Sequence, residues 1–238
     1  MKILVINSGS SSIKFTLFRM PEREELAAGA VERIGENEPV LSYETQGISE
    51  ERSCGAQNHG EALAAAVDTL VEGRQPVLED LDHITAVGHR VVHGGESISE
   101  SVAIDEEIID IIEDNIELAP LHNPPNLMGI RAARERLPDK LHVAVFDTAF
   151  HETLPPRAYT YALPYEMCQE HHVRRYGFHG TSHRYVAEQA AELLSRPLGE
   201  LSLITLHLGN GCSATAVKNG ASVDTSMGYT PLEGLAMG

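Results

Sequence analysis

The distribution of apolar and polar residues along the chain predicts a mixed α/β protein. Short apolar runs bounded by turn residues predict β-strands at residues 2–7, 13–19, 29–35, 39–45, at the start of 84–95, and at 141–147. A further strand–turn–strand is predicted over residues 201–217. Helical periodicity predicts helices at residues 58–72, 104–119 and 180–194, and another begins with NPPN at residue 123.

Polar residues at the helix starts predict where the helices begin. The acidic residues 105–107 suit the positive end of the dipole of an isoleucine-rich helix. Asn123 is expected to cap the helix that starts with NPPN, because the prolines after it suit the first helical positions. Thr181 or Ser182 is expected to cap the last predicted helix through its hydroxyl group.

Two strand–turn–strand segments far apart in the chain resemble each other. The turn in INSGSSSIKF, residues 6–15, matches the turn in HLGNGCSA at an offset of 200, which places Gly9 on Gly209. At this offset Ser10, Ser11 and Ser12 align in sequence with Asn210, Gly211 and Cys212. Each of the two segments is adjacent to further predicted strands or helices. The two similar segments therefore predict a duplicated architecture. The cleft between two such halves is a natural place for a ligand.

The first turn has the composition of an anion-binding loop. Gly9 permits a positive φ and a close approach of the backbone to a ligand. Successive N–H groups in such a turn can form a concavity for an anion, and serine hydroxyls add donors. Lys14 adds a positive charge. The alternative is a solvated hairpin whose serines bond their own backbone, and the Walker A pattern is absent.

Two charged side chains stand at the ends of predicted strands. Arg90, in GHRVVHGG, could recognise a carboxylate or phosphate through two parallel hydrogen bonds. The alternative interpretation is that Arg90 is a cation on the protein surface. Asp147 ends the strand LHVAVFD, at the edge where open α/β sheets collect ligands. There it could orient a metal–nucleotide complex or position a nucleophile. Its alternative is a cap on the following turn.

The segment RRYGFHGTSH places charge beside a predicted helix start. Arg174 and Arg175 concentrate positive charge in an acidic chain, and His179 leads into a helix N-terminus, which favours anions. His179 could donate a hydrogen bond to a phosphoryl group during its transfer. The alternative is a structural histidine, since the chain has 12 of them.

Composition narrows the class of protein. The 35 acidic and 18 basic residues give a formal charge of −17, which disfavours a general nucleic-acid binder because such proteins usually present a basic surface. The three cysteines, Cys54, Cys168 and Cys212, form neither a CxxC pair nor a disulfide framework, and no zinc-ligand spacing occurs. No stretch reaches membrane-spanning length and the first apolar run is too short for a signal peptide. We therefore expect a cytoplasmic protein with no membrane partner.

Taken together, seven segments resemble the acetate kinase family, in the family's order and from residue 3 to residue 238. They are ILVINSGSSSIKF, GHRVVHGG, LAPLHNPPN, VFDTAFH, RRYGFHGTSH, LITLHLGNGCSATAV and DTSMGYTPLEGLAMG. Ser8 and Cys212 stand where alanine is more usual in the family. The resemblance implies an α/β fold of the actin/hexokinase type, a duplicated βββαβαβα core, which agrees with the repeated turns.

The resemblance also implies a reaction and a set of site residues. Family members transfer the γ-phosphoryl group of ATP to acetate reversibly, with Mg²⁺, and form acetyl phosphate and ADP. The implied catalytic residues are Asn7, Arg90, Asp147 and His179, with Asn7 also near the metal. Arg90 would hold the carboxylate, and the methyl group would contact Val92, Leu121, Phe178 and Pro231. The phosphate groups would contact Ser10, Ser12, Lys14, His207, Leu208, Gly209, Asn210 and Gly211.

The resemblance further implies two domains, of which the second is incomplete. Residues 1–148 would form the acetate and phosphate side, and residues 149–238 would form the first part of the nucleotide side. By the same resemblance, the chain of a family member is expected to continue past the position of Gly238. The continuation would supply a second arginine, the adenosine pocket, a magnesium-associated glutamate and much of a homodimer interface.

Three alternatives to an acetate kinase stay open at this point. A propionate kinase differs by one methylene in its substrate, and such a difference is discriminated by only about 1–3 kcal/mol. The 238-residue chain by itself could be a non-catalytic module. A sugar kinase of the same superfamily would need other substrate-side segments than those present.

Overall fold

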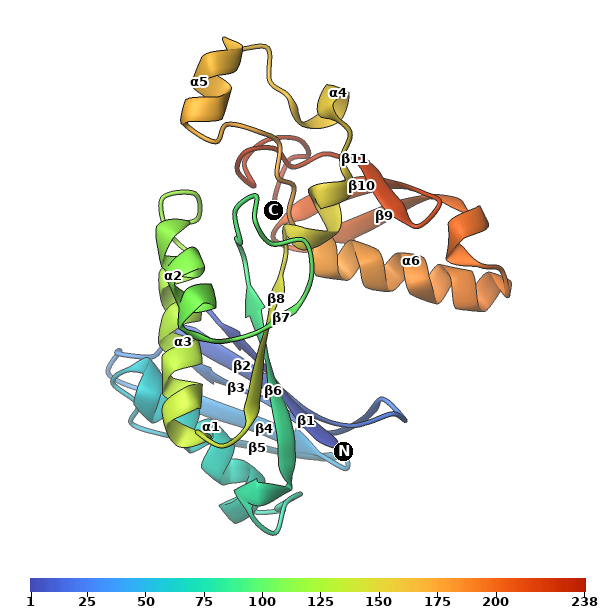
Figure 1. Cartoon of the computed structure of the whole chain (residues 1–238). Helices are drawn as coiled ribbons and strands as arrows, with labels where there is room; N and C mark the ends of the chain where they lie inside the picture. The colour runs from blue at the N-terminus through green and yellow to red at the C-terminus, as the bar shows by residue number, and fades with distance from the viewer. The chain divides into compact units, whose positions relative to one another are not determined.

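The computed structural model describes residues 1–238 as two compact units (Figure 1). Unit 1 comprises Met1–Val91 and Val102–Val145, and unit 2 comprises Val92–Ser101 and Phe146–Gly238. The assignment of residues 1–148 to the acetate side and of residues 149–238 to the nucleotide side stays a prediction.

Unit 1 contains an eight-stranded sheet in the order β5-β4-β3-β2-β1-β6-β8-β7. Its strands are β1 (Lys2–Ser8), β2 (Ser12–Arg19), β3 (Glu24–Glu32), β4 (Val40–Thr45), β5 (Ile48–Ser53), β6 (Ile84–Val91), β7 (Val102–Ala103) and β8 (Leu141–Phe146). Strand β1 pairs antiparallel with β2 and parallel with β6. The sequence pattern did not predict β5 and β7, because β5 is mostly exposed and β7 has only two residues.

Three α-helices accompany this sheet, with a 3₁₀ turn (Leu81–His83) before β6. They are α1 (His59–Glu72), α2 (Glu106–Asp114) and α3 (Asn123–Arg136). The predicted helix 104–119 is shorter at both ends. It begins after Asp105, whose side chain accepts a hydrogen bond from the N–H of Ile108 and caps α2, and it ends at Asp114. The expectation that Asn123 caps the next helix is wrong. Its side chain instead donates to the Ile112 carbonyl, 3.1 Å away, and ties α3 to α2.

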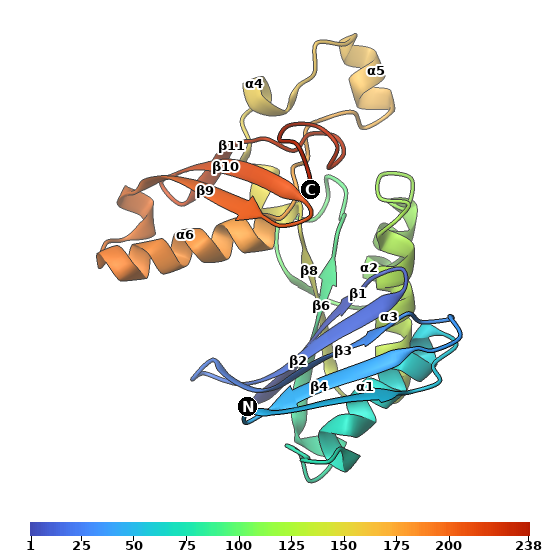
Figure 2. The same cartoon turned by 180° about the vertical axis from the view of Figure 1, so that it is seen from behind.

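Both α1 and α3 lie on one face of the sheet (Figures 1 and 2). Strands β1 and β2 turn alternate apolar side chains toward this face, and they are completely or almost completely buried. These side chains are Leu4, Ile6, Ile13, Phe15 and Leu17. Their burial stabilises unit 1, because fully burying one such side chain contributes about 1.5–3 kcal/mol.

Unit 2 contains a three-stranded antiparallel sheet in the order β11-β10-β9. Its elements are the strands β9 (Ser202–Leu208), β10 (Cys212–Lys218) and β11 (Ala221–Thr225), the helices α4 (Pro156–Tyr159), α5 (Tyr165–Glu170) and α6 (Gly180–Leu194), and the 3₁₀ turns Ala149–Thr153 and Leu198–Glu200. The expected cap by Thr181 or Ser182 is wrong: His179 occupies the N-cap position of α6 and no side chain caps it. No helix in the structure has the length and apolar composition needed to cross a bilayer.

The two units share a three-stranded antiparallel meander, β1-β2-β3 in unit 1 and β9-β10-β11 in unit 2, which supports the duplicated fold. The register corrects one detail of the sequence comparison. Ser8 pairs with Ile13 across a loop of four residues, whereas Leu208 pairs with Cys212 across a loop of three. The offset is therefore 200 on the first strand and 199 on the second, so Cys212 corresponds to Ile13 and not to Ser12.

Equivalent faces of the two meanders are covered differently. In unit 1, α3 packs against β1, where Leu4 and Ile6 are completely or almost completely buried. Their counterparts in unit 2, Ile204 and Leu206, are 78% and 54% exposed. Helix α6 packs on the opposite face of β9, where Thr205 is buried. The chain as described thus leaves one apolar face of the unit 2 sheet open to solvent.

Several histidines are buried in a neutral form. Burial lowers the pKa of His89 and His183 to about 3, and that of His93 and His151 to about 4. In the unfolded chain each would titrate near its ordinary value of about 6.5. Below that pH the unfolded chain binds protons that the folded chain does not bind.

We therefore expect the protein to lose stability steadily as the pH falls from about 6.5 toward 4, by up to about 1.4 kcal/mol per pH unit for each of these histidines. Urea unfolding at pH values between 8 and 5 measures this slope. His151→Gln should flatten it, whereas His171→Gln, at an exposed position of the same unit, should leave it unchanged. Equal slopes in the two variants would contradict the explanation.

Candidate functional site

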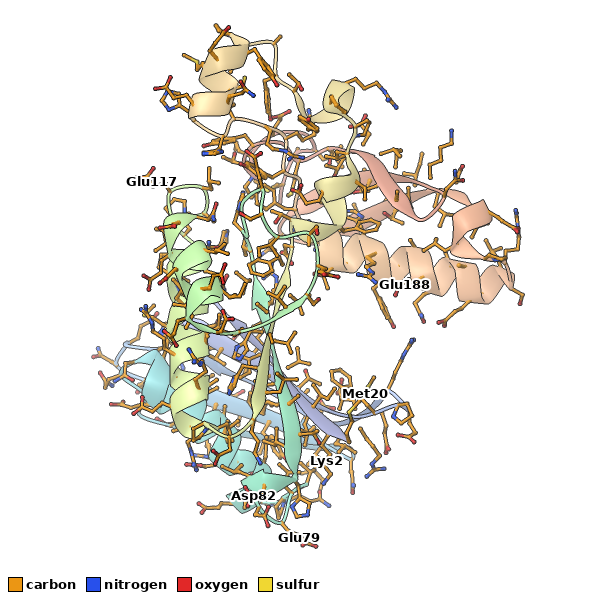
Figure 3. All side chains as sticks on the ribbon, in the orientation of Figure 1. Lys2, Met20, Glu79, Asp82, Glu117 and Glu188 are labelled. Atoms are coloured by element: carbon orange, nitrogen blue, oxygen red, sulfur yellow. The ribbon has the colours of Figure 1, made fainter.

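Three polar side chains form a row across neighbouring strands of unit 1. Asn7 on β1 lies directly opposite Lys14 on β2, so their side chains share one face of the sheet. Asn7 also contacts β6, where the Arg90 guanidinium donates to its Oδ1 over 3.2 Å. The row lies at the end of β1 that leads into the serine-rich loop, while Lys2 and Asp82, labelled in Figure 3, mark the opposite end of the sheet. This arrangement places two cations and one amide beside the loop.

Hydrogen bonds from two side chains outside the serine-rich loop hold its backbone in place. Neither of these two residues was identified from the sequence. The N–H of Gly9 donates to the Ser12 carbonyl over 2.7 Å and closes the turn. The Gly9 carbonyl lies 2.8 Å from Nε2 of His59, at the start of α1. The Ser8 carbonyl accepts from the Asn126 side chain of α3 over 2.7 Å. Both supporting side chains are buried, whereas the loop serines are exposed or half-buried and can reach a ligand.

The hydroxyl group of Ser8 is buried without a hydrogen-bond partner, in close contact with α3. Gly129 of α3 packs against it so closely that an added Cβ there would lie 2.6 Å from the Ser8 Cβ. A buried hydroxyl without a partner is destabilising by about 1–3 kcal/mol.

Ser8→Ala is therefore expected to raise the free energy of unfolding by about 1 kcal/mol, because alanine keeps the packing and removes the unpaired hydroxyl. Urea unfolding of the variant measures the change. Ser11→Ala, at an exposed position of the same loop, is the matched control and should stay within about 0.5 kcal/mol of the parent protein. A destabilised Ser8→Ala variant would show that the hydroxyl has a partner.

In unit 2, Asp147 lies beside the start of α6. Asp147 is almost completely buried, and its carbonyl accepts from the N–H of Gly180 over 2.8 Å. Only glycine fits there, since an added Cβ at Gly180 would lie 2.3 Å from that carbonyl oxygen. Thr181 Oγ1 approaches a carboxylate oxygen of Asp147 at 3.5 Å. The helix start thus holds the carboxylate in place.

His179 has a left-handed backbone and a tightly confined ring. Its φ is +60°, a conformation that non-glycine residues adopt rarely and that often marks functional positions. Its imidazole stacks on His207 with ring centroids 3.9 Å apart, and His207 Nδ1 is 2.9 Å from Ser182 Oγ. Nδ1 of His179 is 2.8 Å from the hydroxyl of Ser213. The ring is therefore held on one face and at one nitrogen.

The loop of residues 209–211, between β9 and β10, contacts the edge of the His179 ring that carries Cε1 and Nε2. An added Cβ at Gly211 would lie 2.9 Å from Cε1 and 3.0 Å from Nε2 of His179. The N–H of Gly209 donates to the Gly211 carbonyl over 3.0 Å and closes the turn. The structure therefore brings His179 together with Gly211 and His207, two of the residues predicted to contact phosphate. Leu208, which was predicted with them, is 71% exposed.

Arg174 and Arg175 are bonded within unit 2. The Arg174 guanidinium lies 3.4 Å from a Glu152 carboxylate oxygen and over the ring of Tyr159. Arg175 donates to the Thr225 carbonyl over 2.9 Å and forms an ion pair with Glu233 at 2.8 Å. Arg174 is thus paired near α4, and Arg175 is bonded to the end of β11 and to Glu233. Both guanidinium groups have partners within the protein, so the anion-binding interpretation of RRYGFHGTSH rests on His179 and the start of α6.

The four residues predicted to contact a methyl group differ in exposure. Val92 and Phe178, both in unit 2, are almost completely buried. Pro231 in the same unit is half-buried. Leu121 of unit 1 is 75% exposed. Their shared role in one pocket stays a prediction.

The chain is similar over its whole length to curated acetate kinases. It is 54% identical to the acetate kinase of Caldanaerobacter subterraneus subsp. tengcongensis over 239 residues, which cover 100% of this chain and 60% of that protein. It is 55% identical to the acetate kinase of Thermotoga petrophila, again over 100% of this chain and 59% of that protein. The chain thus spans about 60% of the length of the curated relatives that it matches.

Solved structures give the same result. The chain matches the crystal structure of Porphyromonas gingivalis acetate kinase with a TM-score of 0.95 and 46% identity, over 99% of this chain and 59% of that one. A propionate kinase from Francisella tularensis subsp. tularensis matches with a TM-score of 0.91 and 44% identity, over 99% and 59%. The family model of the Acetokinase family matches residues 2–238. The chain therefore belongs to the Acetokinase family.

Proposed function

We propose that this chain is the acetate- and phosphate-binding part of an enzyme that transfers a phosphoryl group reversibly between ATP and acetate, giving acetyl phosphate and ADP. The observation that carries the proposal is the row of Lys14, Asn7 and Arg90 beside the serine-rich loop. Phosphoryl transfer needs positioning and charge stabilisation more than covalent chemistry from the protein. An ionised carboxylate is already a nucleophile, so the reaction needs no general base.

Each site residue then has a specific role. Arg90 binds the carboxylate through two parallel hydrogen bonds and is oriented by its hydrogen bond to Asn7. Asn7 and His179 contact the transferring phosphoryl group. The nucleotide phosphates contact the two loops, through Ser10, Ser12 and Lys14 of unit 1 and through His207 to Gly211 of unit 2. The methyl group contacts Val92, Leu121, Phe178 and Pro231.

In this proposal Mg²⁺ is an ion bound mainly to the phosphate oxygens of the nucleotide. No group of three or more His, Cys, Asp or Glu side chains forms a metal cage. Mg²⁺ normally uses only one or two carboxylates together with water and phosphate oxygens, and the buried carboxylate of Asp147 suits that role. The amide oxygen of Asn7 accepts from a guanidinium, which favours its phosphoryl contact over direct metal binding. When bound, the ion neutralises negative charge on the phosphates.

A coupled assay of acetyl phosphate formation by the full-length protein tests the proposal, with acetate, propionate and butyrate compared as acceptors. We expect acetate to give the highest kcat/KM. Propionate is the specific competitor, because a propionate kinase is among the similar structures and one methylene is weakly discriminated. Equal or better turnover of butyrate would overturn the assignment.

We further propose a homodimer in the cytoplasm, with acetate, acetyl phosphate, ATP and ADP as its ligands and no nucleic acid. The exposed apolar face of the unit 2 sheet is consistent with further protein surface covering it in the complete molecule. The mass of the full-length protein in solution tests the dimer. Phosphorylation of acetate by the isolated 238-residue chain would show that these residues suffice for catalysis.

A further inference from the structure

The imidazole of His151 bonds to the backbone directly before His179. Nε2 of His151 lies 3.0 Å from the Phe178 carbonyl oxygen, and its Nδ1 lies 2.9 Å from the Ser222 hydroxyl oxygen. His151 and Ser222 are both 0% exposed, and all of these residues belong to unit 2. The ring therefore joins the 3₁₀ turn Ala149–Thr153 to β11 and to the peptide group that precedes His179.

The Phe178 carbonyl determines which nitrogen of this ring carries the proton. A carbonyl oxygen can only accept, so Nε2 of His151 is protonated and donates to it. Burial lowers the pKa of His151 to about 4, so the ring is neutral and its Nδ1 has no proton. Ser222 consequently donates its hydroxyl proton to Nδ1. In a neutral ring only this arrangement satisfies both contacts.

The backbone of Gly177 packs against the same ring. Gly177 has a φ of +73°, and an added Cβ there would lie 2.7 Å from Cδ2 of His151 and 2.6 Å from Cγ2 of Thr225. Glycine permits both the positive φ and this close approach. The His151 ring is therefore bonded at both nitrogens and packed against the backbone on its Cδ2 side.

His179 has a peptide group on each side, and both groups are bonded within unit 2. The carbonyl of Phe178 accepts from His151, and the N–H of Gly180 donates to the Asp147 carbonyl over 2.8 Å. The φ and ψ of a residue are the rotations that relate its two peptide groups. Holding both groups therefore maintains the φ of +60° at His179, a conformation that the surrounding structure must impose on a residue other than glycine.

We propose that His151 is a positioning residue for His179. Through the Phe178 carbonyl it holds the left-handed backbone that directs the His179 imidazole toward its contacts with His207 and Ser213. The hydrogen bonds of His151 do not depend on any substrate. Their consequence for catalysis rests on the proposed function, in which His179 contacts the transferring phosphoryl group, and His151 acts on the reaction only through His179.

Nitrogen-15 NMR of histidine-labelled full-length protein, without substrate, tests the hydrogen bonds. The His151 signal is assigned by its loss in His151→Gln. We expect a ring protonated at Nε2 alone, whose proton exchanges slowly with water and which stays neutral down to about pH 5, because its pKa is about 4. An Nδ1–H tautomer, or protonation of His151 near the ordinary pKa of about 6.5, would overturn the proposal whatever the activity of the protein.

A matched pair of substitutions tests the effect on the reaction. Methionine and glutamine have side chains of similar length, but only glutamine can donate a hydrogen bond to the Phe178 carbonyl. His151→Met is expected to lower kcat by about 10- to 100-fold with little change in the KM for acetate, because a small displacement of a reacting group has an effect of this size. His151→Gln should recover kcat to within about threefold of the parent value, since the donor is kept. Equal kcat values in the two variants would overturn the role of the hydrogen bond.

Thr153→Val separates the Phe178 contact from a general loosening of the 3₁₀ turn. Thr153 also joins this turn to β11, because its Oγ1 donates to the Ser222 carbonyl over 2.8 Å. The substitution removes that contact and leaves the Phe178 carbonyl bonded, so kcat should stay close to the parent value. A loss as large as that in His151→Met would show that the turn as a whole matters, and would overturn a specific role for His151.

A double-mutant cycle tests whether His151 acts through His179. In a His179→Ala background the positioned ring is absent, so His151→Met should lower kcat little further. An equal loss in both backgrounds would contradict positioning. An unchanged kcat in His179→Ala alone would overturn the catalytic role proposed for His179 and the kinetic part of this inference with it, whereas the NMR result decides the hydrogen bonds separately.

Discussion

Replacing Arg90 by alanine is expected to lower kcat/KM for acetate by about 10²- to 10⁴-fold in the full-length protein. A charge-assisted hydrogen bond contributes about 1.5–3 kcal/mol, and a guanidinium makes two of them to one carboxylate. Arg90→Lys should recover only part of the loss, because an ammonium group cannot make the paired contact. The measurement is the initial rate of acetyl phosphate formation at varied acetate and saturating ATP.

Arg134→Ala is the matched control for this prediction. Arg134 belongs to the same unit but pairs with Glu106 on the surface of α3 at 2.8 Å. Exposed pairs of this kind contribute only about 0–1 kcal/mol to stability, so both stability and kcat/KM should stay close to the parent values. If Arg90→Ala retained more than about a tenth of the parent kcat/KM, the carboxylate would have another binding residue.

Asn7 acts partly through Arg90 in this account, and a double-mutant cycle separates its two roles. The hydrogen bond from Arg90 to Asn7 Oδ1 orients the guanidinium. If orientation is the whole effect, Asn7→Ala should cost activity in the parent protein but little in an Arg90→Ala background. A loss that persists in that background would be the contribution of Asn7 to the phosphoryl group itself.

The elements of the fold that follow from local patterns were predictable, and those that depend on partners were not. The apolar runs around the serine-rich loop predicted β1 and β2, because their side chains alternate toward a buried face. The sequence of β5, ISEERS, carries no such signal, since this strand is held by its pairing with β4 and not by burial. The start of α2 is set by a local contact, the Asp105 cap, whereas the Asn123 amide bonds to Ile112 of the neighbouring helix, which the sequence around Asn123 does not indicate.

The site shows the same division between local and distant information. Arg90, Asp147 and His179 were identifiable because each stands at a strand or helix end with a suitable charge or donor. The contact between Asn7 and Arg90 depends on the parallel pairing of two strands separated by more than 70 residues. Ser213 lies in a segment whose sequence predicts only a β-strand. Its place between His179 and His183 depends on the packing of β10 beside α6 and could not be predicted from that segment.

Replacing Gly211 by alanine is expected to lower kcat by about 10²-fold without unfolding the protein. The added Cβ would lie 2.9 Å from Cε1 of His179, and the ring cannot move away freely because it stacks on His207. A displacement of about 1 Å at a reacting group can cost about 10²-fold in rate. The measurements are kcat and the thermal midpoint, and the latter should change little because alanine suits the backbone at this position.

Two comparisons make the Gly211 prediction specific to His179. Gly199→Ala is the matched control, since nothing lies within 4 Å of an added Cβ there, and kcat should be unchanged. In a His179→Ala background the ring that Gly211→Ala displaces is absent, so the second substitution should have little further effect. If Gly211→Ala instead lowered kcat equally in both backgrounds, the loop would act on the phosphate groups directly, through the N–H groups of residues 209–211.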